Sequence, residues 1–367
     1  MAEIDPWGDV DVGDYDETMA QFGIEPIESV AERLPDDRLV RRGVVFGQRD
    51  LDRALDARDA GKPFAVMTGL MPSGRFHFGH LAVVEQVLTF QKMGAAVTLC
   101  AADVESYVTR DVSLSDARER VVEEYLLNYV ALGLDLDSTD FYFQSGAGND
   151  HHVRSKLFAR HVTENEFAAT YGGADPAKMT AAFTQYADVL RPQSPERGGP
   201  KPTVVPVGID QDPHVRMTRD VAARFRDADY VKPASTYHRF LRGLQGGKMS
   251  SSDPDSYVAL TDDVEDAKRK IDRAKTGGRV SVEEHRRKGA DIEEDVVFEL
   301  LAAHLIADDD ELERIREEYE SGEMLSGELK SIAKERLAAF LREHRRKREA
   351  ARPEVEQYVA EHTVAEP

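Results

Sequence analysis

The stretch that decides the fold runs from residue 64 to residue 102 and reads FAVMTGLMPSGRFHFGHLAVVEQVLTFQKMGAAVTLCAA. It opens with Phe64-Ala65-Val66-Met67-Thr68, a short apolar run typical of a buried strand. A loop with proline and glycine follows, apolar side chains then recur at helical spacing until Gly94, and residues 97–102 are apolar again. Strand, loop, helix and strand in this order predict the opening of a parallel nucleotide-binding sheet.

Two loops in the chain could hold the phosphates of ATP. The first is Pro72-Ser73-Gly74-Arg75-Phe76-His77-Phe78-Gly79-His80, in which two imidazoles beside a helix N-terminus can donate to phosphate oxygens. The second is Lys248-Met249-Ser250-Ser251-Ser252, which brings one ammonium group among hydroxyls. Histidine pairs also occur at surfaces and metal sites, and loops of glycine, serine and lysine are often only loops. Both loops together favour ATP activation.

The rest of the chain first continues this α/β pattern and is then predicted to contain helices without strands. Further strands are expected at residues 141–143 and 204–208, although Pro206 suggests the end of the second one. After Thr261 the strand signals stop, and capping signatures from Asp262 and from Ser281 open helices. The predicted parts are an N-terminal extension (1–45), a Rossmann-like parallel-sheet domain (46–260) with a helical insertion (about 105–200, most continuous at 149–190), and an all-α domain (261–367).

Composition narrows the class of protein. A chain of 367 residues suits two domains, and no uncharged apolar run reaches the ~20 residues that span a bilayer. The first residues lack the basic and apolar parts of a signal peptide, so we expect a cytoplasmic enzyme. The one cysteine, Cys100, excludes an internal disulfide and a multi-cysteine metal site.

The net charge of -21 is unusual for a partner of nucleic acid, and 34 of the 48 basic residues are arginine. In concentrated salt the Debye length falls to ~3 Å, so that close phosphate contacts rather than the global field decide binding. An acidic, lysine-poor composition indicates adaptation to high intracellular salt. The alternative is an ordinary acidic protein from a low-salt cell.

The two phosphate loops resemble the signatures with which class I aminoacyl-tRNA synthetases bind ATP. Longer strings resemble the archaeal and eukaryotic tryptophanyl-tRNA synthetases in particular. These strings are IDQDPHVRMTRDVA (209–222), GGR (277–279), EEHR (283–286), SGEMLSGELK (321–330), and the shorter Asp5-Pro6-Trp7, Asp14-Tyr15-Asp16, Arg41-Arg42-Gly43 and Arg49-Asp50. The resemblance covers the chain from about Asp5 to the C-terminal helices. It implies ATP-dependent activation of L-tryptophan and its transfer to tRNA(Trp).

The resemblance also implies roles for the matching residues. The catalytic residues would be His77, His80 and Lys248, which stabilise the transition state of adenylate formation. The ATP-binding residues would be Pro72, Ser73, Gly74, Gly79, Gly208, Asp210, Met249, Ser250, Ser251 and Ser252. The amino-acid-binding residues would be Met67, Cys100, Glu105, Gln185 and Gln211. Without the resemblance, Glu105 is a surface carboxylate, the glutamines are ordinary polar residues of helices, and Asp210 or Asp212 is a helix N-cap.

Two positions depart from the eukaryotic relatives. Met67 stands where those relatives have a tyrosine, and Cys100 where they have a glutamine, and those two side chains bind the indole N–H there. A buried N–H without an acceptor costs ~1–3 kcal/mol. Another residue or a water must therefore supply the acceptor, or the specificity differs.

The implied partners are tRNA(Trp), L-tryptophan and ATP with Mg²⁺, with no membrane, no tightly bound cofactor and no protein metal site. A homodimer formed through the insertion is implied by the resemblance alone. In the family the helical domain grips the anticodon, and the basic stretch 342–352 could face RNA or be a solvated helix face. Rival functions are a tyrosine–tRNA ligase, a paralogue that binds RNA or a small ligand without charging tRNA, and a small-molecule nucleotidylyltransferase.

Overall fold

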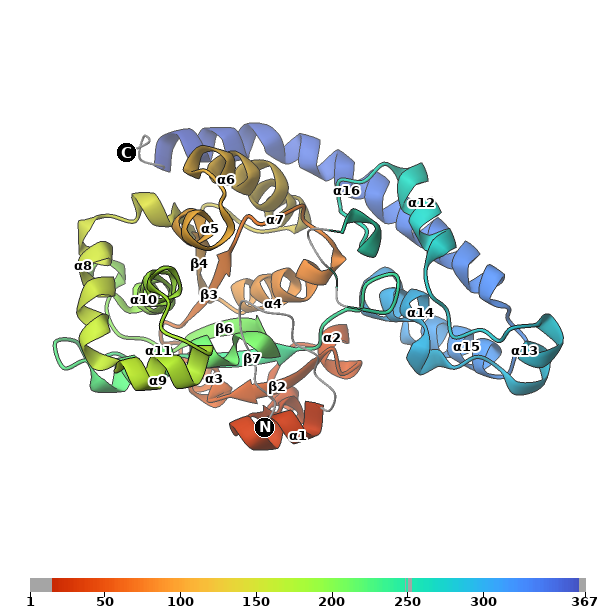
Figure 1. Cartoon of the computed structure of the whole chain (residues 1–367), viewed down its shortest axis with the longest axis horizontal. Helices are drawn as coiled ribbons and strands as arrows, with labels where there is room; N and C mark the ends of the chain where they lie inside the picture. Colours follow the sequence, from red (N-terminus) through yellow and green to blue (C-terminus); the bar gives the residue numbers. More distant parts are fainter. Residues whose placement is uncertain (1–14, 248, 250–252, 363–367) are drawn as a thin grey trace.

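The computed structural model describes residues 15–247, 249 and 253–362. Its centre is a seven-stranded sheet of order β1-β2-β7-β6-β3-β4-β5 (Figure 1). The strands are β1 (Glu25–Pro26), β2 (Val45–Arg49), β3 (Ala65–Leu70), β4 (Ala96–Ala101), β5 (Thr139–Phe143), β6 (Thr203–Gly208) and β7 (Ala234–His238). Strands β7, β6, β3, β4 and β5 are parallel, whereas β1 and β2 add an antiparallel edge.

Helices surround this sheet and continue beyond it (Figure 1). They are α1 (Tyr15–Phe22), α2 (Arg38–Arg41), α3 (Leu51–Asp59), α4 (Leu81–Lys92), α5 (Asp103–Arg110), α6 (Leu114–Arg120), α7 (Leu127–Leu132), α8 (Asn149–Phe158), α9 (Glu164–Tyr171), α10 (Pro176–Leu190), α11 (Asp212–Arg224), α12 (Val264–Arg273), α13 (Val282–Lys288), α14 (Val296–Leu300), α15 (Asp309–Glu320) and α16 (Ser326–His362). Two π-helical turns lie at Val121–Leu126 and Leu301–Leu305. Among the described residues, no helix is long and apolar enough to cross a membrane.

The predicted opening of the sheet is confirmed, because β3, the histidine loop, α4 and β4 follow in that order. Helix α6 begins at Leu114, and its N-cap is Ser113, whose side chain accepts from the backbone N–H of Asp116 at 3.1 Å. The first π-helical turn and α7 continue this helical run to its C-cap, Gly133, whose φ of 117° lies in the region that favours glycine. The helices expected between residues 149 and 190 are α8, α9 and α10.

Three local expectations were wrong. Pro206 does not end its strand, because β3 pairs with β6 only at Thr203 and Val204, and β6 continues beside β7 to Gly208 without needing the missing N–H. The cap of α12 is Asp263 and not Asp262. Strands β2 and β7 were not expected at all, since neither is a continuous apolar run.

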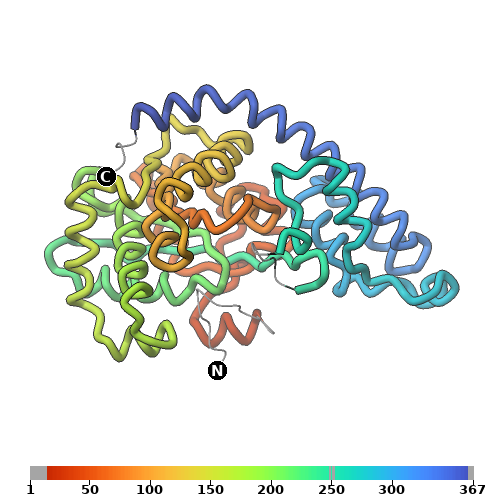
Figure 2. The backbone as a smooth tube through the Cα atoms, turned by 45° about the horizontal axis from the view of Figure 1, so that its top comes forward, coloured from red at the N-terminus to blue at the C-terminus, as the bar shows by residue number. Residues whose placement is uncertain are grey.

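The hydrophobic core joins the sheet to the helical C-terminal part. One cluster contains Val66 and Leu99 of the sheet together with Leu329 and Leu337 of α16. Helices α9, α10 and α11 form a separate small core around buried aromatic side chains such as Tyr171. Helix α16 crosses the whole molecule, packing against α12 and α14 with one part and against α7 with another (Figure 2).

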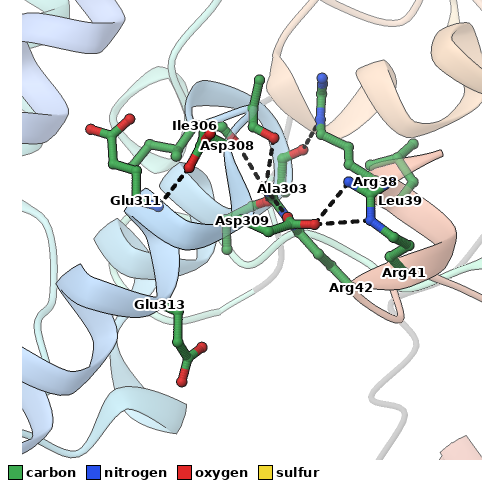
Figure 3. Close-up of polar contacts among 12 residues, drawn as sticks. Arg38, Leu39, Arg41, Arg42, Ala303, Ile306, Asp308, Asp309, Glu311 and Glu313 are labelled. Atoms are coloured by element: carbon green, nitrogen blue, oxygen red, sulfur yellow. Dashed lines mark hydrogen bonds and ion pairs between the residues drawn. The ribbon is translucent and has the colours of Figure 1, made fainter. Parts of the chain in front are cut away.

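A polar joint, formed by Arg38 and Arg42, links the N-terminal segment to the helical part. Arg42, directly after α2, donates to the backbone carbonyls of Ala302 and Ile306 at 2.6 Å each, at the end of the second π-helical turn (Figure 3). Arg38 donates to the carbonyl of Ala303 at 3.1 Å and pairs with Glu85 of α4 at 2.6 Å. The helix that begins after His80 is therefore tied to the helical part through α2.

Candidate functional site

The candidate site lies at the carboxyl ends of the parallel strands. Strand β3 has β6 on one side and β4 on the other, and the connections from β3 and β6 leave the sheet there. In an open α/β sheet, such a switch point forms the crevice that binds ligands. The histidine loop follows β3, Glu105 lies just after β4, and Asp210 and Gln211 follow β6.

The backbone fixes the orientation of the two imidazoles. His77 Nδ1 accepts the N–H of Gly79 at 3.1 Å, and His80 Nδ1 lies 3.1 Å from the N–H of His77, so each side chain caps the short turn Phe78–His80. The ring centroids are 4.0 Å apart. Because Nδ1 of His77 is an acceptor, its proton sits on Nε2, where it can be donated to a phosphate oxygen.

Both imidazoles are neutral near pH 7. Burial lowers the pKa of His77 to about 2, and the neighbouring His80 adds to this shift. Burial also lowers the pKa of His80 to about 4, although the contact with the His77 backbone opposes it. The pair therefore offers N–H donors rather than positive charge to a ligand.

The first π-helical turn and the residue before it hold the loop that precedes the histidines. Arg120 donates to the carbonyl of Pro72 at 2.9 Å, and the Tyr125 hydroxyl donates to the carbonyl of Gly74 at 3.2 Å. The sequence gives no sign of this role for Tyr125. The signal was weak, since a π-helical turn at Val121–Leu126 leaves no mark in hydrophobic periodicity.

Met249, the described residue of the second predicted ATP loop, lies close to Gly79 of the first. A Cβ there would lie 2.9 Å from Cε1 of His77 and 3.1 Å from Sδ of Met249, so only glycine fits. The chain that follows the second loop also returns to the first, since His77 and Ala259 form an antiparallel bridge. The predicted catalytic Lys248 and the predicted ATP-binding residues Ser250, Ser251 and Ser252 lie outside the described residues.

The predicted ribose-binding residues form a tight corner after β6. A Cβ on Gly208 would lie 2.7 Å from Oδ1 of Asp210 and 2.8 Å from Cε1 of Phe240. Asp210 is 9% exposed, and its Oδ2 accepts from the Gln211 side chain at 3.2 Å. The alternative role as a helix cap does not apply, because Gln211 occupies the N-cap position of α11 and makes no side-chain capping bond.

Met67 and Cys100 lie together in a buried apolar cluster with Tyr142, Val189 and Val205. Each of the five is at most 5% exposed. Burial raises the pKa of the Cys100 thiol, and the nearby Asp188 carboxylate raises it further. The two positions that depart from the eukaryotic relatives thus form one surface beside a carboxylate.

Asp188 is a residue that sequence analysis missed. Its Oδ1 accepts from the Tyr142 hydroxyl at 2.7 Å and lies 3.0 Å from Nε2 of His151, and its Oδ2 accepts from Gln144 at 2.7 Å. Burial would raise the pKa of Asp188, but His151, Tyr142 and Gln144 outweigh it and hold the pKa below its usual value. The available signal was one charged residue within the apolar run Tyr186–Leu190 of α10.

Glu105 and Gln185 could hold an ammonium group. Glu105, on α5, is 9% exposed, and α5 packs against α10, which carries Gln185. Oε1 of Gln185 is a buried atom without a hydrogen-bond partner among the described residues, which suits an additional donor. No group of three or more His, Cys, Asp or Glu side chains in the described part of the chain could hold a metal ion.

A cavity of about 1000 Å³ extends from the histidine loop toward the helical part. Gly79, Ala82 and Phe240 line it on the sheet side, and Ala302 and Ala303 of the second π-helical turn line it on the other. Arg42 also lines this cavity. The histidine loop therefore borders the cavity between the sheet and the helical part.

Comparisons with known proteins agree with this geometry. The family model described as "tRNA synthetases class I (W and Y)" matches residues 59–168 and 185–342. The tryptophan–tRNA ligase of Aeropyrum pernix is 45% identical over 355 residues, covering 95% of each chain. The chain belongs to the tryptophanyl-tRNA synthetase family.

Other relatives of that family give the same result. The tryptophan–tRNA ligase of Methanopyrus kandleri is 45% identical, covering 99% of this chain and 98% of its own. The crystal structure of the tryptophanyl-tRNA synthetase from Aeropyrum pernix superposes with a TM-score of 0.91 at 44% identity, covering 96% of this chain and 98% of that one. The resemblance stated from sequence and the Rossmann-like class I fold are thereby confirmed.

Proposed function

We propose that this protein is a tryptophan–tRNA ligase, which activates L-tryptophan with ATP and transfers the tryptophanyl group to tRNA(Trp). One observation carries the proposal. Strands β3 and β4 contribute Met67 and Cys100 to the apolar cluster, and the same strands lead directly to the histidine loop and to Glu105. An aromatic amino acid and the phosphates of ATP would therefore meet at one edge of the sheet.

In the first step, the carboxylate of tryptophan attacks the α-phosphate of ATP, and pyrophosphate leaves. Negative charge builds on the phosphate oxygens, where the Nε2–H of His77 and a neutral His80 can stabilise it. Glu105 and Gln185 would hold the ammonium group, and Mg²⁺ would enter with ATP. In the second step, a ribose hydroxyl at the end of the tRNA takes the acyl group, so no protein nucleophile is needed.

Asp188 supplies the hydrogen-bond acceptor for the indole N–H that Met67 and Cys100 do not supply. Its carboxylate lies beside the Cys100 thiol and interacts with it, and an indole N–H would take the place of that thiol as a donor. An indole N–H donated there would be satisfied. The same carboxylate would also accept a phenolic hydroxyl, and this favours tyrosine as the second candidate substrate. The larger indole fills space that a phenol would leave empty, which favours tryptophan.

Pyrophosphate exchange with each of the twenty amino acids tests this function. We expect tryptophan to exchange fastest and tyrosine measurably but poorly. Asp188→Leu should lower kcat/KM for tryptophan roughly 10- to 150-fold by leaving the N–H unpaired, and Asp188→Asn, which keeps an acceptor oxygen, should lower it less. Faster exchange with tyrosine, or exchange with neither, would rule out the assignment.

The proposed RNA partner is tRNA(Trp). In the basic stretch of α16, His344 is buried and bonded to Asn128, and Arg352 pairs with Glu123, so these residues fasten the helix to the rest of the molecule. Contact with RNA would fall to the exposed Arg342 and Lys347. Charging of tRNA(Trp) separates a ligase from a paralogue that only binds.

A homodimer through the inserted helices and a cytoplasmic location are further parts of the proposal. Tyr107 of α5 and Val153 and Leu157 of α8 are 59%, 41% and 46% exposed, and a partner subunit could cover them. Mass measurement in solution tests the dimer, with Leu157→Glu as the disrupting variant. The net charge of -21 supports a working environment of concentrated salt.

A further inference from the structure

Gln144 is a buried glutamine at the point where β5 passes into the short turn Gln144–Gly146. It is 1% exposed, and sequence analysis gave it no role. Its side-chain amide lies between two segments that contribute to the amino-acid site. These are α5, with the ammonium-binding candidate Glu105, and α10, with the indole acceptor Asp188.

Both ends of this amide are used, and they differ chemically. Oε1 of Gln144 accepts the backbone N–H of Glu105 at 3.0 Å, and Nε2 donates to Oδ2 of Asp188 at 2.7 Å. A backbone N–H can only donate and a carboxylate oxygen can only accept. The amide therefore has one orientation, and it links the backbone of Glu105 to the carboxylate of Asp188 through a single rigid group.

Neighbouring contacts hold this bridge in place. Tyr142 and Gln144 are two residues apart at the end of a strand, so both side chains point to the same side, and each bonds one oxygen of Asp188. The backbone N–H of Ser145 donates to Oδ1 of Asp103 at 3.0 Å, which fixes the turn against the start of α5. The plane of the Asp188 carboxylate is thus set from β5.

We propose that Gln144 is a positioning residue that sets Asp188 and Glu105 at the separation and orientation that tryptophan requires. The inference rests on the proposed function, because it assumes that these carboxylates bind the ring N–H and the ammonium group. A glutamine that only satisfied the core would affect stability and leave the recognition of the two ends of the substrate unchanged.

Gln144→Leu, which keeps the volume and removes both bonds, tests this proposal. The measured quantities are the kcat/KM of pyrophosphate exchange for tryptophan and for benzothienylalanine, whose sulfur replaces the indole N–H, and the Ki of indole-3-propionate, which lacks the ammonium group. We expect the wild type to discriminate against both analogues. In Gln144→Leu the preference for tryptophan over each of the two analogues should fall roughly tenfold, while the KM for ATP stays unchanged.

Gln193 offers a matched control. It is also 1% exposed, and its amide also makes two bonds, both at 2.8 Å, but to the backbone of Val231. Gln193→Leu should lower Tm about as much as Gln144→Leu and leave both analogue preferences intact. Unchanged preferences in Gln144→Leu would overturn the proposal. A wild type that does not exchange with tryptophan would instead overturn the proposed function.

Gln144→Glu provides a second variant in case the leucine variant fails to fold. Its carboxylate can still accept from the Glu105 N–H but can no longer donate to Asp188 unless it is protonated. The preference against benzothienylalanine should fall roughly tenfold, and the preference against indole-3-propionate should stay. Equal losses of both preferences, or no loss of either, would contradict the positioning role.

Discussion

Two uncharged imidazoles act on phosphate differently from two cations. A cation attracts ATP before and during the reaction, whereas a fixed N–H donor gains most when charge increases on the oxygen that it faces. His77 and His80 are neutral at pH 7 and oriented by the backbone of their own turn. Their contribution should therefore appear in the rate of adenylate formation more than in the affinity for substrates.

We predict that His77→Ala lowers the rate of adenylate formation by ~10²-fold, because a donor to the transition state is lost. The dissociation constant of tryptophan should change little. Rapid quench and equilibrium dialysis measure the two quantities. Lys248→Ala, which lies outside the described residues, should behave likewise. His362→Gln, at an exposed histidine, serves as the control, and an equal loss of tryptophan affinity in His77→Ala would argue for a ground-state role.

The sequence predicted the site residues that lie within continuous family motifs. It missed the residues whose role depends on contacts between segments far apart in the chain. Gly79 was predicted from its loop, and the structure supplies a steric reason for it. Asp188 and Gln144 were not predicted, because one residue belongs to α10 and the other follows β5. Nothing in the local pattern shows that both meet Cys100 or Glu105.

At the scale of elements, periodicity predicted β3, α4, β4 and the C-terminal helices but not β2 or β7. Strand β7 contains Ser235, Thr236 and His238, and all three are at most 4% exposed. These polar side chains are buried by neighbouring strands and loops, so no apolar run in the sequence predicts this strand. The sheet therefore has three more strands, β1, β2 and β7, than its hydrophobic pattern predicts.

The joint between α2 and the second π-helical turn gives a prediction about stability. Arg42→Ala should lower the free energy of unfolding by ~1–3 kcal/mol, because the carbonyls of Ala302 and Ile306 lose a buried donor. Denaturant unfolding measures the change. Arg346→Ala is the matched control, since Arg346 is exposed and pairs along its own helix with Glu343. Arg346→Ala should lower the free energy of unfolding by less than ~0.5 kcal/mol. Equal losses in the two variants would show that the joint adds no stability.

For the whole molecule, buried histidines predict acid sensitivity. Burial lowers the pKa of His214 to about 3 and those of His238 and His344 to about 4, as it does for His77. Between pH 6.5 and 4 the unfolded chain binds protons that the folded chain does not, so stability falls as the pH falls through this window.

Each such histidine should contribute a slope of up to about 1.4 kcal/mol per pH unit. Urea midpoints at several pH values measure the slope. His344→Asn should reduce it by about one proton, whereas a variant of exposed His362 should not. A midpoint that does not move between pH 6 and pH 5 would contradict the expectation.

The acidic composition gives a second prediction at this scale. With a net charge of -21, repulsion among carboxylates should lower Tm and aminoacylation in about 0.1 M KCl relative to about 2 M KCl. Thermal unfolding and charging of tRNA(Trp) at both salt concentrations check this. Full activity and unchanged Tm in the dilute salt would favour the ordinary acidic protein.

The position of helix α16 decides whether the helical part can be separated from the sheet. About 55 Å long for its 37 residues, it starts in the helical part and ends against the outer strand of the sheet. There the Tyr358 hydroxyl donates to the carbonyl of Thr139 at 2.7 Å and lies 3.4 Å from the N–H of Phe141, covering an edge that would otherwise be exposed to other chains. The helical part is thus no transplantable module, and grafting it onto another synthetase would mean rebuilding the border of the recipient's sheet.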